Sequence, residues 1–185
     1  MKRSFLSFVF GCRVNEAERA QIDRQLVEVG FTLDFVLPTF LIINTCAITG
    51  KAEREARQLV NQLRKKYPSA QIVLTGCSAT LWDKYNTKDT AIADILVPND
   101  KKPSLVSILL AKCATYEVAK GHSRLVGDKF RLSNRLLVKI QDGCHLFCSY
   151  CIVPYLRGKP ISTPTQQIEK LFNNIYLACQ DCEKL

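Results

Sequence analysis

Three short apolar segments, each leading into a cysteine, recur along the first part of the chain and constrain its fold more than any other feature. Cys12, Cys46 and Cys77 are 34 and 31 residues apart, a spacing that matches one strand–helix–strand step. A helical pattern of apolar residues follows each cysteine. Strands separated by helices form a parallel sheet with right-handed crossovers. The spacing therefore predicts an open, mostly parallel α/β domain of the Rossmann or flavodoxin type over residues 1–112.

Hydrophobic periodicity, capping residues and prolines predict where the strands and helices of this domain lie. Strands are expected at residues 4–10, 41–44, 71–75 and 95–97. Helices are expected at residues 15–29, 52–66, 79–85 and 103–111. Asn15 is expected to cap the first helix. The polar and basic residues 113–133 are expected to form a linker.

The charge and the cysteine count exclude several classes of protein. The net charge of +9 suggests a polyanionic partner. Nine cysteines cannot all pair within one chain, so a secreted, disulfide-stapled protein is a poor fit. No apolar run approaches the roughly 18 residues of a membrane span. We therefore expect a cytoplasmic protein with no membrane partner.

The three widely spaced cysteines are candidates for one site. Each follows a strand, and the carboxyl ends of parallel strands form the binding crevice of an open sheet. Each also precedes a helix, whose N-terminus favours a thiolate. Gly11 and Gly76 lie directly before two of the cysteines and allow close backbone approach. The alternative is that Cys12, Cys46 and Cys77 are separate, partly buried cysteines that act as small hydrophobic residues.

A second set, Cys144, Cys148 and Cys151, has the local spacing C-x3-C-x2-C. Three sulfurs on one short loop can hold a metal ion or a cluster, and a 4Fe–4S cluster is normally held by four cysteines. With three cysteines, one iron stays open to bind a substrate or a cofactor. The alternative is a structural zinc site with His145 as the fourth ligand, but adjacent Cys144 and His145 are poorly placed around one tetrahedral ion.

The segments around both sets resemble the methylthiotransferases of the radical S-adenosylmethionine family. The resemblance is carried by residues 11–15, 44–49, 75–77 and 139–158, and it extends over nearly the whole chain. It implies two 4Fe–4S clusters: an auxiliary cluster held by Cys12, Cys46 and Cys77, and a radical cluster held by Cys144, Cys148 and Cys151. S-adenosylmethionine would bind the open iron of the radical cluster and be cleaved to a 5′-deoxyadenosyl radical. Tyr150 would contact the adenine of this cofactor, with Arg157 as a weaker candidate.

Residues 139–144, Lys-Ile-Gln-Asp-Gly-Cys, are most similar to the family branch that inserts a methylthio group at C2 of threonylcarbamoyladenosine beside the tRNA anticodon. The positive net charge agrees with a tRNA partner, and the chemistry implies an electron donor such as flavodoxin or ferredoxin. Three alternatives stay open. The same chemistry could act on isopentenyl-adenosine in tRNA or on a ribosomal protein, or the chain could be a non-catalytic iron–sulfur or zinc module that binds RNA.

Residues 134–185 are expected to form only the start of a radical S-adenosylmethionine (β/α) barrel. They offer a strand at 135–140, the cysteine loop and a helix at 164–178, whereas a complete (β/α)8 barrel takes about 250 residues. We therefore expect the chain to be an N-terminal fragment that cannot turn over alone.

Overall fold

The computed structural model describes residues 3–85, 88–113 and 137–182. The chain forms two compact units, Met1–Leu137 and Val138–Leu185. In the first unit, a five-stranded sheet has the order β2-β1-β3-β4-β5, and every pairing is parallel. The strands are β1 (Ser4–Val9), β2 (Thr32–Leu33), β3 (Phe40–Thr45), β4 (Gln71–Gly76) and β5 (Ile95–Val97). The expected α/β class is confirmed, and the strand order is that of flavodoxin-like folds.

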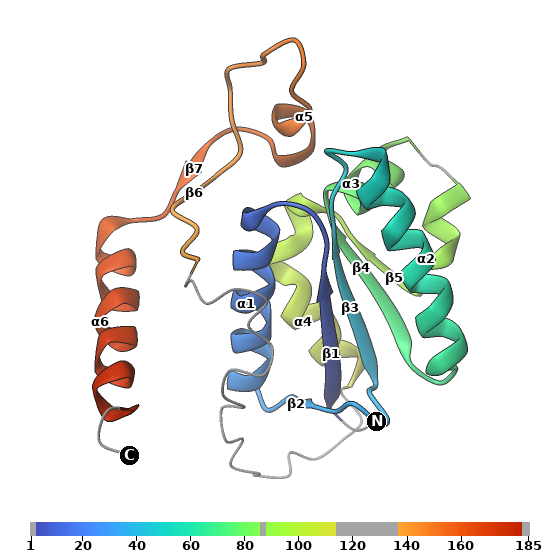
Figure 1. The fold of residues 1–185 in the computed structure, drawn as a ribbon, viewed down its shortest axis with the longest axis horizontal. Coiled ribbons are helices and arrows are strands. Elements are labelled where there is room, and N and C mark those ends of the chain that lie inside the picture. The colour runs from blue at the N-terminus through green and yellow to red at the C-terminus, as the bar shows by residue number, and fades with distance from the viewer. Residues whose placement is uncertain (1–2, 86–87, 114–136, 183–185) are drawn as a thin grey trace. The chain divides into compact units, whose positions relative to one another are not determined.

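Helices cover both faces of this sheet (Figure 1). They are α1 (Arg13–Glu28), α2 (Gly50–Lys66), α3 (Cys77–Lys84) and α4 (Leu105–Lys112), with short 3-10 helices η1 (Lys88–Ile92) and η2 (Asn99–Ser104). One core cluster joins Leu26 of α1 and Leu109 of α4 to the sheet, and the other joins Val60 of α2 and Trp82 of α3 to the opposite face. Because both faces are covered, β3 is buried along its whole length, as is usual for parallel sheets.

The two-residue edge strand β2 was not expected from the sequence. It pairs only with Ser4 and Phe5 at the start of β1. Because β2 is so short, residues 34–39 can connect it to the start of β3 without a helix. Backbone bonds from Asp34 N to Phe5 O (3.2 Å) and from Thr39 N to Ser4 O (3.1 Å) fix this return. Two residues are too few to produce a recognisable hydrophobic period.

The expectation that Asn15 caps the first helix is wrong. Helix α1 begins at Arg13, with Cys12 in the N-cap position and no side-chain cap. Asn15 lies inside the helix, and its buried amide donates to Phe10 O (3.0 Å) and to Thr45 O (2.9 Å). Its side chain therefore joins the loops that follow β1 and β3 instead of capping the helix.

The chain reverses its direction of travel across the sheet between β1 and β3, because β1 has β2 on one side and β3 on the other. In open α/β sheets, ligands bind at the carboxyl ends of the strands beside such a switch point. Cys12 and Cys46 follow the two strands that flank it. The topology thus places two of the candidate ligands at the usual binding edge.

The second unit contains a small antiparallel pair and two helices. Its elements are β6 (Gln141–Asp142), α5 (Val153–Arg157), β7 (Ile161–Ser162) and α6 (Thr165–Cys182). The strand expected at 135–140 is displaced: residues 137–140 are not in a strand, and residues 135–136 lie outside the described residues. A strand needs a partner, and in the described part of this unit β6 and β7 provide it for each other. No helix in the described part of the chain is long and apolar enough to cross a membrane.

Candidate metal centres

The first candidate centre lies at the carboxyl ends of β1, β3 and β4, which are neighbours in the sheet. Cys12 is the N-cap of α1, Cys46 directly follows β3, and Cys77 is the first residue of α3. Cys46 and Cys77 are buried and Cys12 is half-buried. Successive strand–helix steps therefore deliver three thiols to one edge of the sheet.

The thiols of Cys12 and Cys46 are joined by a hydrogen bond, which raises the pKa of Cys46 above its ordinary value. Burial raises this pKa further, as do the charges of Cys12 and Cys77, and a backbone bond from Ile48 opposes the rise. The sulfurs of Cys12 and Cys77 are thus both within electrostatic range of Cys46. Neighbouring sulfurs resist ionising together, and a cationic centre that accepts three thiolates would relieve this repulsion. The chemistry of this donor set, three thiols, therefore fits a metal-containing group.

Two glycines let the backbone pack closely beside the cysteines, Gly11 against Cys46 and Gly76 against the end of β3. Gly11 has a φ of +87°, and a Cβ at this position would overlap the Cβ and Sγ of Cys46. Gly76 has a φ of +94°, and a Cβ there would overlap the carbonyl oxygen of Thr45 and lie 2.6 Å from Asn44 Oδ1. Both positions combine a conformation that disfavours side chains with a lack of space. The close approach predicted from the sequence is present at both glycines.

Hydrogen bonds tie the loops around the cysteines to one another. Ser78 Oγ donates to Cys46 O at 2.6 Å, so the residue after Cys77 holds the backbone of Cys46. Thr45 Oγ1 donates to Thr75 O at 2.6 Å and accepts from Ala79 N at 3.1 Å. These bonds link the ends of β3 and β4 to the start of α3. Buried polar contacts from β4 and from α3 therefore support the end of β3, where Cys46 lies.

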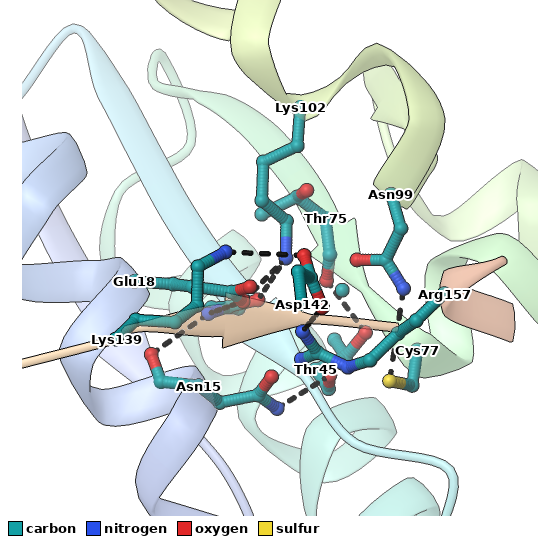
Figure 2. Close-up of polar contacts among 12 residues, drawn as sticks. Asn15, Glu18, Thr45, Thr75, Cys77, Asn99, Lys102, Lys139, Asp142 and Arg157 are labelled. Atoms are coloured by element: carbon teal, nitrogen blue, oxygen red, sulfur yellow. Dashed lines mark hydrogen bonds and ion pairs between the residues drawn. The ribbon is translucent and has the colours of Figure 1, made fainter. Parts of the chain in front are cut away.

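A buried ion pair lies beside these loops (Figure 2). Lys102 Nζ of η2 is 2.7 Å from Glu18 Oε2 of α1, with side chains 10% and 3% exposed. Lys102 also donates to Asn44 Oδ1 at 3.3 Å, and Asn44 Nδ2 donates to Asn15 O at 2.9 Å. The two charges are thus embedded in a hydrogen-bonded network, without which burial of a charge is costly.

The sequence interpretation did not predict this network, because it gave Asn15 a capping role and assigned no role to Glu18 or Lys102. Asn44 is a buried polar residue that follows the apolar run 40–43, and Lys102 follows the fourth expected strand at the same sheet edge as the cysteines. Both features were signals in the sequence. Buried polar residues generally require specific partners, and residues after a parallel strand lie at the binding edge.

The second candidate centre is the loop with Cys144, Cys148 and Cys151. Cys144 and Cys151 are half-buried and Cys148 is exposed. Backbone bonds of 3.0 Å run from Cys144 N to Gly158 O and from Cys151 N to Cys148 O. The first bond closes the base of the loop, and the second forms a turn between the last two cysteines. Three thiols are therefore confined to one short, closed loop.

Asp142 holds the base of this loop through three contacts. It accepts from Arg157 Nη1 (2.7 Å), Lys139 Nζ (3.1 Å) and Gly143 N (2.8 Å) (Figure 2). Burial opposes ionisation of Asp142, but the hydrogen bond and charge of Arg157, followed by Lys139, outweigh it and lower the pKa. Arg157, the weaker sequence candidate for a cofactor contact, is therefore engaged in closing the loop. Tyr150 is 91% exposed, and its contact with a cofactor stays a prediction.

Removing the guanidinium in Arg157→Ala is expected to loosen the cysteine loop. The charge-assisted bond to Asp142 should contribute about 1.5–3 kcal/mol, seen as reduced hydrogen-exchange protection of residues 143–157 in the complete chain. Lys139→Ala is the control with a smaller expected effect, because its contact is longer and more exposed. Equal protection in Arg157→Ala and the parent would contradict this role.

The same ion pair predicts a pH dependence of the loop. The folded-state pKa of Asp142 lies below its ordinary value of 3.8, so its stabilisation is complete above that value and is lost as the pH falls through the lower folded-state pKa. Protection factors of the parent loop should therefore decrease below about pH 4. The decrease should be smaller in Arg157→Ala.

Among the described residues, no group of three or more histidine, cysteine, aspartate or glutamate side chains is arranged around a single metal ion.

The family comparison covers most of the first unit. The model of the family described as uncharacterized protein family UPF0004 matches residues 5–98. The chain belongs to UPF0004. The matched residues include all of the parallel sheet except Ser4, and all three strand-end cysteines of this UPF0004 domain.

Curated relatives of this UPF0004 chain are tRNA methylthiotransferases by name. Threonylcarbamoyladenosine tRNA methylthiotransferase MtaB of Chlamydia pneumoniae is 39% identical over 171 residues, which are 91% of this chain and 39% of the relative. The protein of the same name from Aquifex aeolicus is 29% identical over 92% of this chain and 43% of its own length. A tRNA-2-methylthio-N(6)-dimethylallyladenosine synthase of Buchnera aphidicola is 31% identical over 86% of this chain and 39% of its own length. The UPF0004 chain thus spans about two fifths of these relatives.

Proposed function

We propose that this chain is the part of a tRNA methylthiotransferase that binds two 4Fe–4S clusters and S-adenosylmethionine. The observation that carries the proposal is that Cys12, Cys46 and Cys77 lie at the carboxyl ends of three neighbouring strands, two of which flank the switch point of the sheet. Cysteines that only fill a core do not need glycines at positive φ packed against them, whereas Gly11 lies against Cys46. The second set, on a loop closed by Asp142 and Arg157, supplies the other centre.

The bound clusters would supply one-electron cleavage of S-adenosylmethionine and the sulfur that is transferred. The chain's own residues hold these groups with three thiolates at each centre, which leaves one iron of each cluster without a protein ligand. Burial of Cys46 and Cys77 keeps water from two ligands of the first centre. Exposure of Cys148 and Tyr150 leaves the second loop accessible to S-adenosylmethionine and to an electron donor such as flavodoxin or ferredoxin.

We propose threonylcarbamoyladenosine beside the tRNA anticodon as the target base. The Chlamydia pneumoniae relative, named for this nucleoside, is 39% identical, and the Buchnera aphidicola relative, named for dimethylallyladenosine, is 31% identical. The net charge of +9 suits a polyanionic substrate. A tRNA substrate also supports a cytoplasmic location. The second relative makes the dimethylallyl nucleoside the competing substrate.

Mass spectrometry of tRNA nucleosides tests the proposed substrate. Deleting the coding sequence in the source organism should remove 2-methylthio-threonylcarbamoyladenosine and accumulate its precursor, while 2-methylthio-isopentenyladenosine stays unchanged. Restoring the native sequence should restore the product, and restoring it with Cys144→Ala should not. Loss of the isopentenyl product instead would replace the proposed substrate with the competing one. Unchanged tRNA would overturn the proposal.

A further inference from the structure

The segment after β5 contributes a side chain to the first centre. Asn99, the first residue of η2, donates its side-chain amide to Cys77 Sγ at 3.7 Å (Figure 2). Asn99 is not part of the cysteine pattern in the sequence. It follows β5, whereas the three cysteines follow β1, β3 and β4. A fourth strand end therefore reaches the same site with a hydrogen-bond donor.

Hydrogen bonds hold Asn99 next to the turn that carries Cys77. Its backbone N–H donates to Thr80 Oγ1 at 2.9 Å, and Thr80 Oγ1 donates to Gly76 O at 2.8 Å. Gly76 directly precedes Cys77, so the hydroxyl of Thr80 connects the backbone of Asn99 to the backbone beside the sulfur. On the same 3-10 helix, Lys102 forms the buried ion pair with Glu18. The segment that carries the Asn99 amide is thus held by the backbone bond to Thr80 and by the ion pair of Lys102.

A comparison with Cys46 indicates what this donor does. The sulfur of Cys46 receives the backbone N–H of Ile48, whereas the sulfur of Cys77 receives the side-chain amide of Asn99. Hydrogen bonds to ligand sulfurs are among the factors that set the reduction potential of iron–sulfur groups. Reduction adds negative charge, and an N–H donor stabilises the more negative state. The donor at Cys77 comes from a side chain, so it can be removed by substitution.

We propose that Asn99 is a positioning residue for Cys77 and that its amide raises the reduction potential of the group bound by Cys12, Cys46 and Cys77. This inference rests on the proposed function, because it requires an iron–sulfur group at the first centre. It assigns a role in electron distribution to a residue outside both cysteine sets.

The test uses the complete chain with Cys144, Cys148 and Cys151 replaced by alanine, so that only the first centre takes up iron. The protein is reconstituted anaerobically with iron and sulfide, and its midpoint potential is measured by dye-mediated titration and its reduced state by electron paramagnetic resonance. Asn99→Asp preserves the side-chain volume without the amide donor, and Asn99→Ala removes the side chain. Asn61→Ala, at an exposed position of α2, is the matched control.

Both Asn99 variants should retain iron and have a more negative midpoint potential than the parent and Asn61→Ala. The loss of one hydrogen bond should lower the equilibrium constant of reduction by up to about tenfold, or about 59 mV for a one-electron couple. Asn99→Asp should shift further than Asn99→Ala because a carboxylate adds negative charge beside the sulfur. An altered resonance of the reduced state should accompany the shift.

Two failures are distinguishable. If Asn99→Asp binds iron with the potential and resonance of the parent, the role of Asn99 is overturned and the proposed function stands. If the parent background binds no iron, the proposed first centre is overturned, and the inference with it. If Asn99→Ala loses iron through misfolding, Asn99→Asp decides the question, because it keeps the side-chain volume as well as the backbone bond to Thr80.

Discussion

Alanine in place of Cys46 is expected to halve the iron retained by the anaerobically reconstituted chain, from about eight atoms to about four. Cys46 is buried, its thiol is hydrogen-bonded to Cys12, and the charge of Cys77 raises its pKa. Its removal leaves two thiols, which are too few to hold a cubane cluster. Iron and sulfide analysis per chain measures the effect, and Cys144→Ala should reduce the iron by the same amount through the other centre.

Cys113→Ala is the matched control for this prediction. Cys113 is also fully buried, but it lies in the core cluster beside Leu105 and Leu109. Its variant should keep about eight irons even if it is less stable. A parent chain with about four irons that are unaffected by Cys46→Ala would exclude the first centre. Zinc without iron would overturn the radical chemistry and favour an RNA-binding module.

Alanine in place of Gly11 is expected to eliminate iron at the first centre and to destabilise the fold. The new Cβ would overlap the side chain of Cys46, and the φ of +87° disfavours any side chain. Backbone strain should contribute about 1–3 kcal/mol and overpacking about 1–3 kcal/mol more. Urea unfolding of the apo chain measures the sum, and iron analysis measures the loss of the site.

Gly30 offers a closely matched control for backbone strain. Its φ is +90°, but no atom lies within 4 Å of a Cβ built there. Gly30→Ala should therefore show the strain alone, with iron retained. The difference between the two variants measures the close approach of Gly11 to Cys46. If the two variants behave alike, that approach has no role in the site.

The sequence predicted the parts of the fold that depend on local patterns. The limits of β5, Ile95–Val97, match the expected range, because a short apolar run between polar segments has few alternatives. The close backbone approach at Gly11 and Gly76 was also predicted correctly, since a glycine before a strand-end cysteine indicates that there is no space for a side chain. These predictions needed no knowledge of distant neighbours.

The missed features depend on neighbours that are distant in the sequence. Asn15 was assigned as a cap because asparagine favours that position, but its amide acts on Thr45, thirty residues away. Asn99 and Lys102 have no periodic pattern, and their roles appear only when η2 lies beside α1 and α3. In the second unit, residues 137–140 have high strand propensity but do not form a strand. Propensity alone does not provide a partner.

The separation of the first three cysteines along the chain also links ligand binding to global stability. Cys12, Cys46 and Cys77 come together only when three strands have paired, so a group that binds them binds the folded sheet and not the unfolded chain. Such a ligand raises the free energy of unfolding of the whole domain by RT ln(1 + L/Kd), where L is the free ligand concentration. The loop of Cys144, Cys148 and Cys151 brings its ligands together over a few residues and requires only local order. Loss of iron from the first centre would therefore report unfolding of the entire sheet, whereas loss from the second would report the opening of one loop.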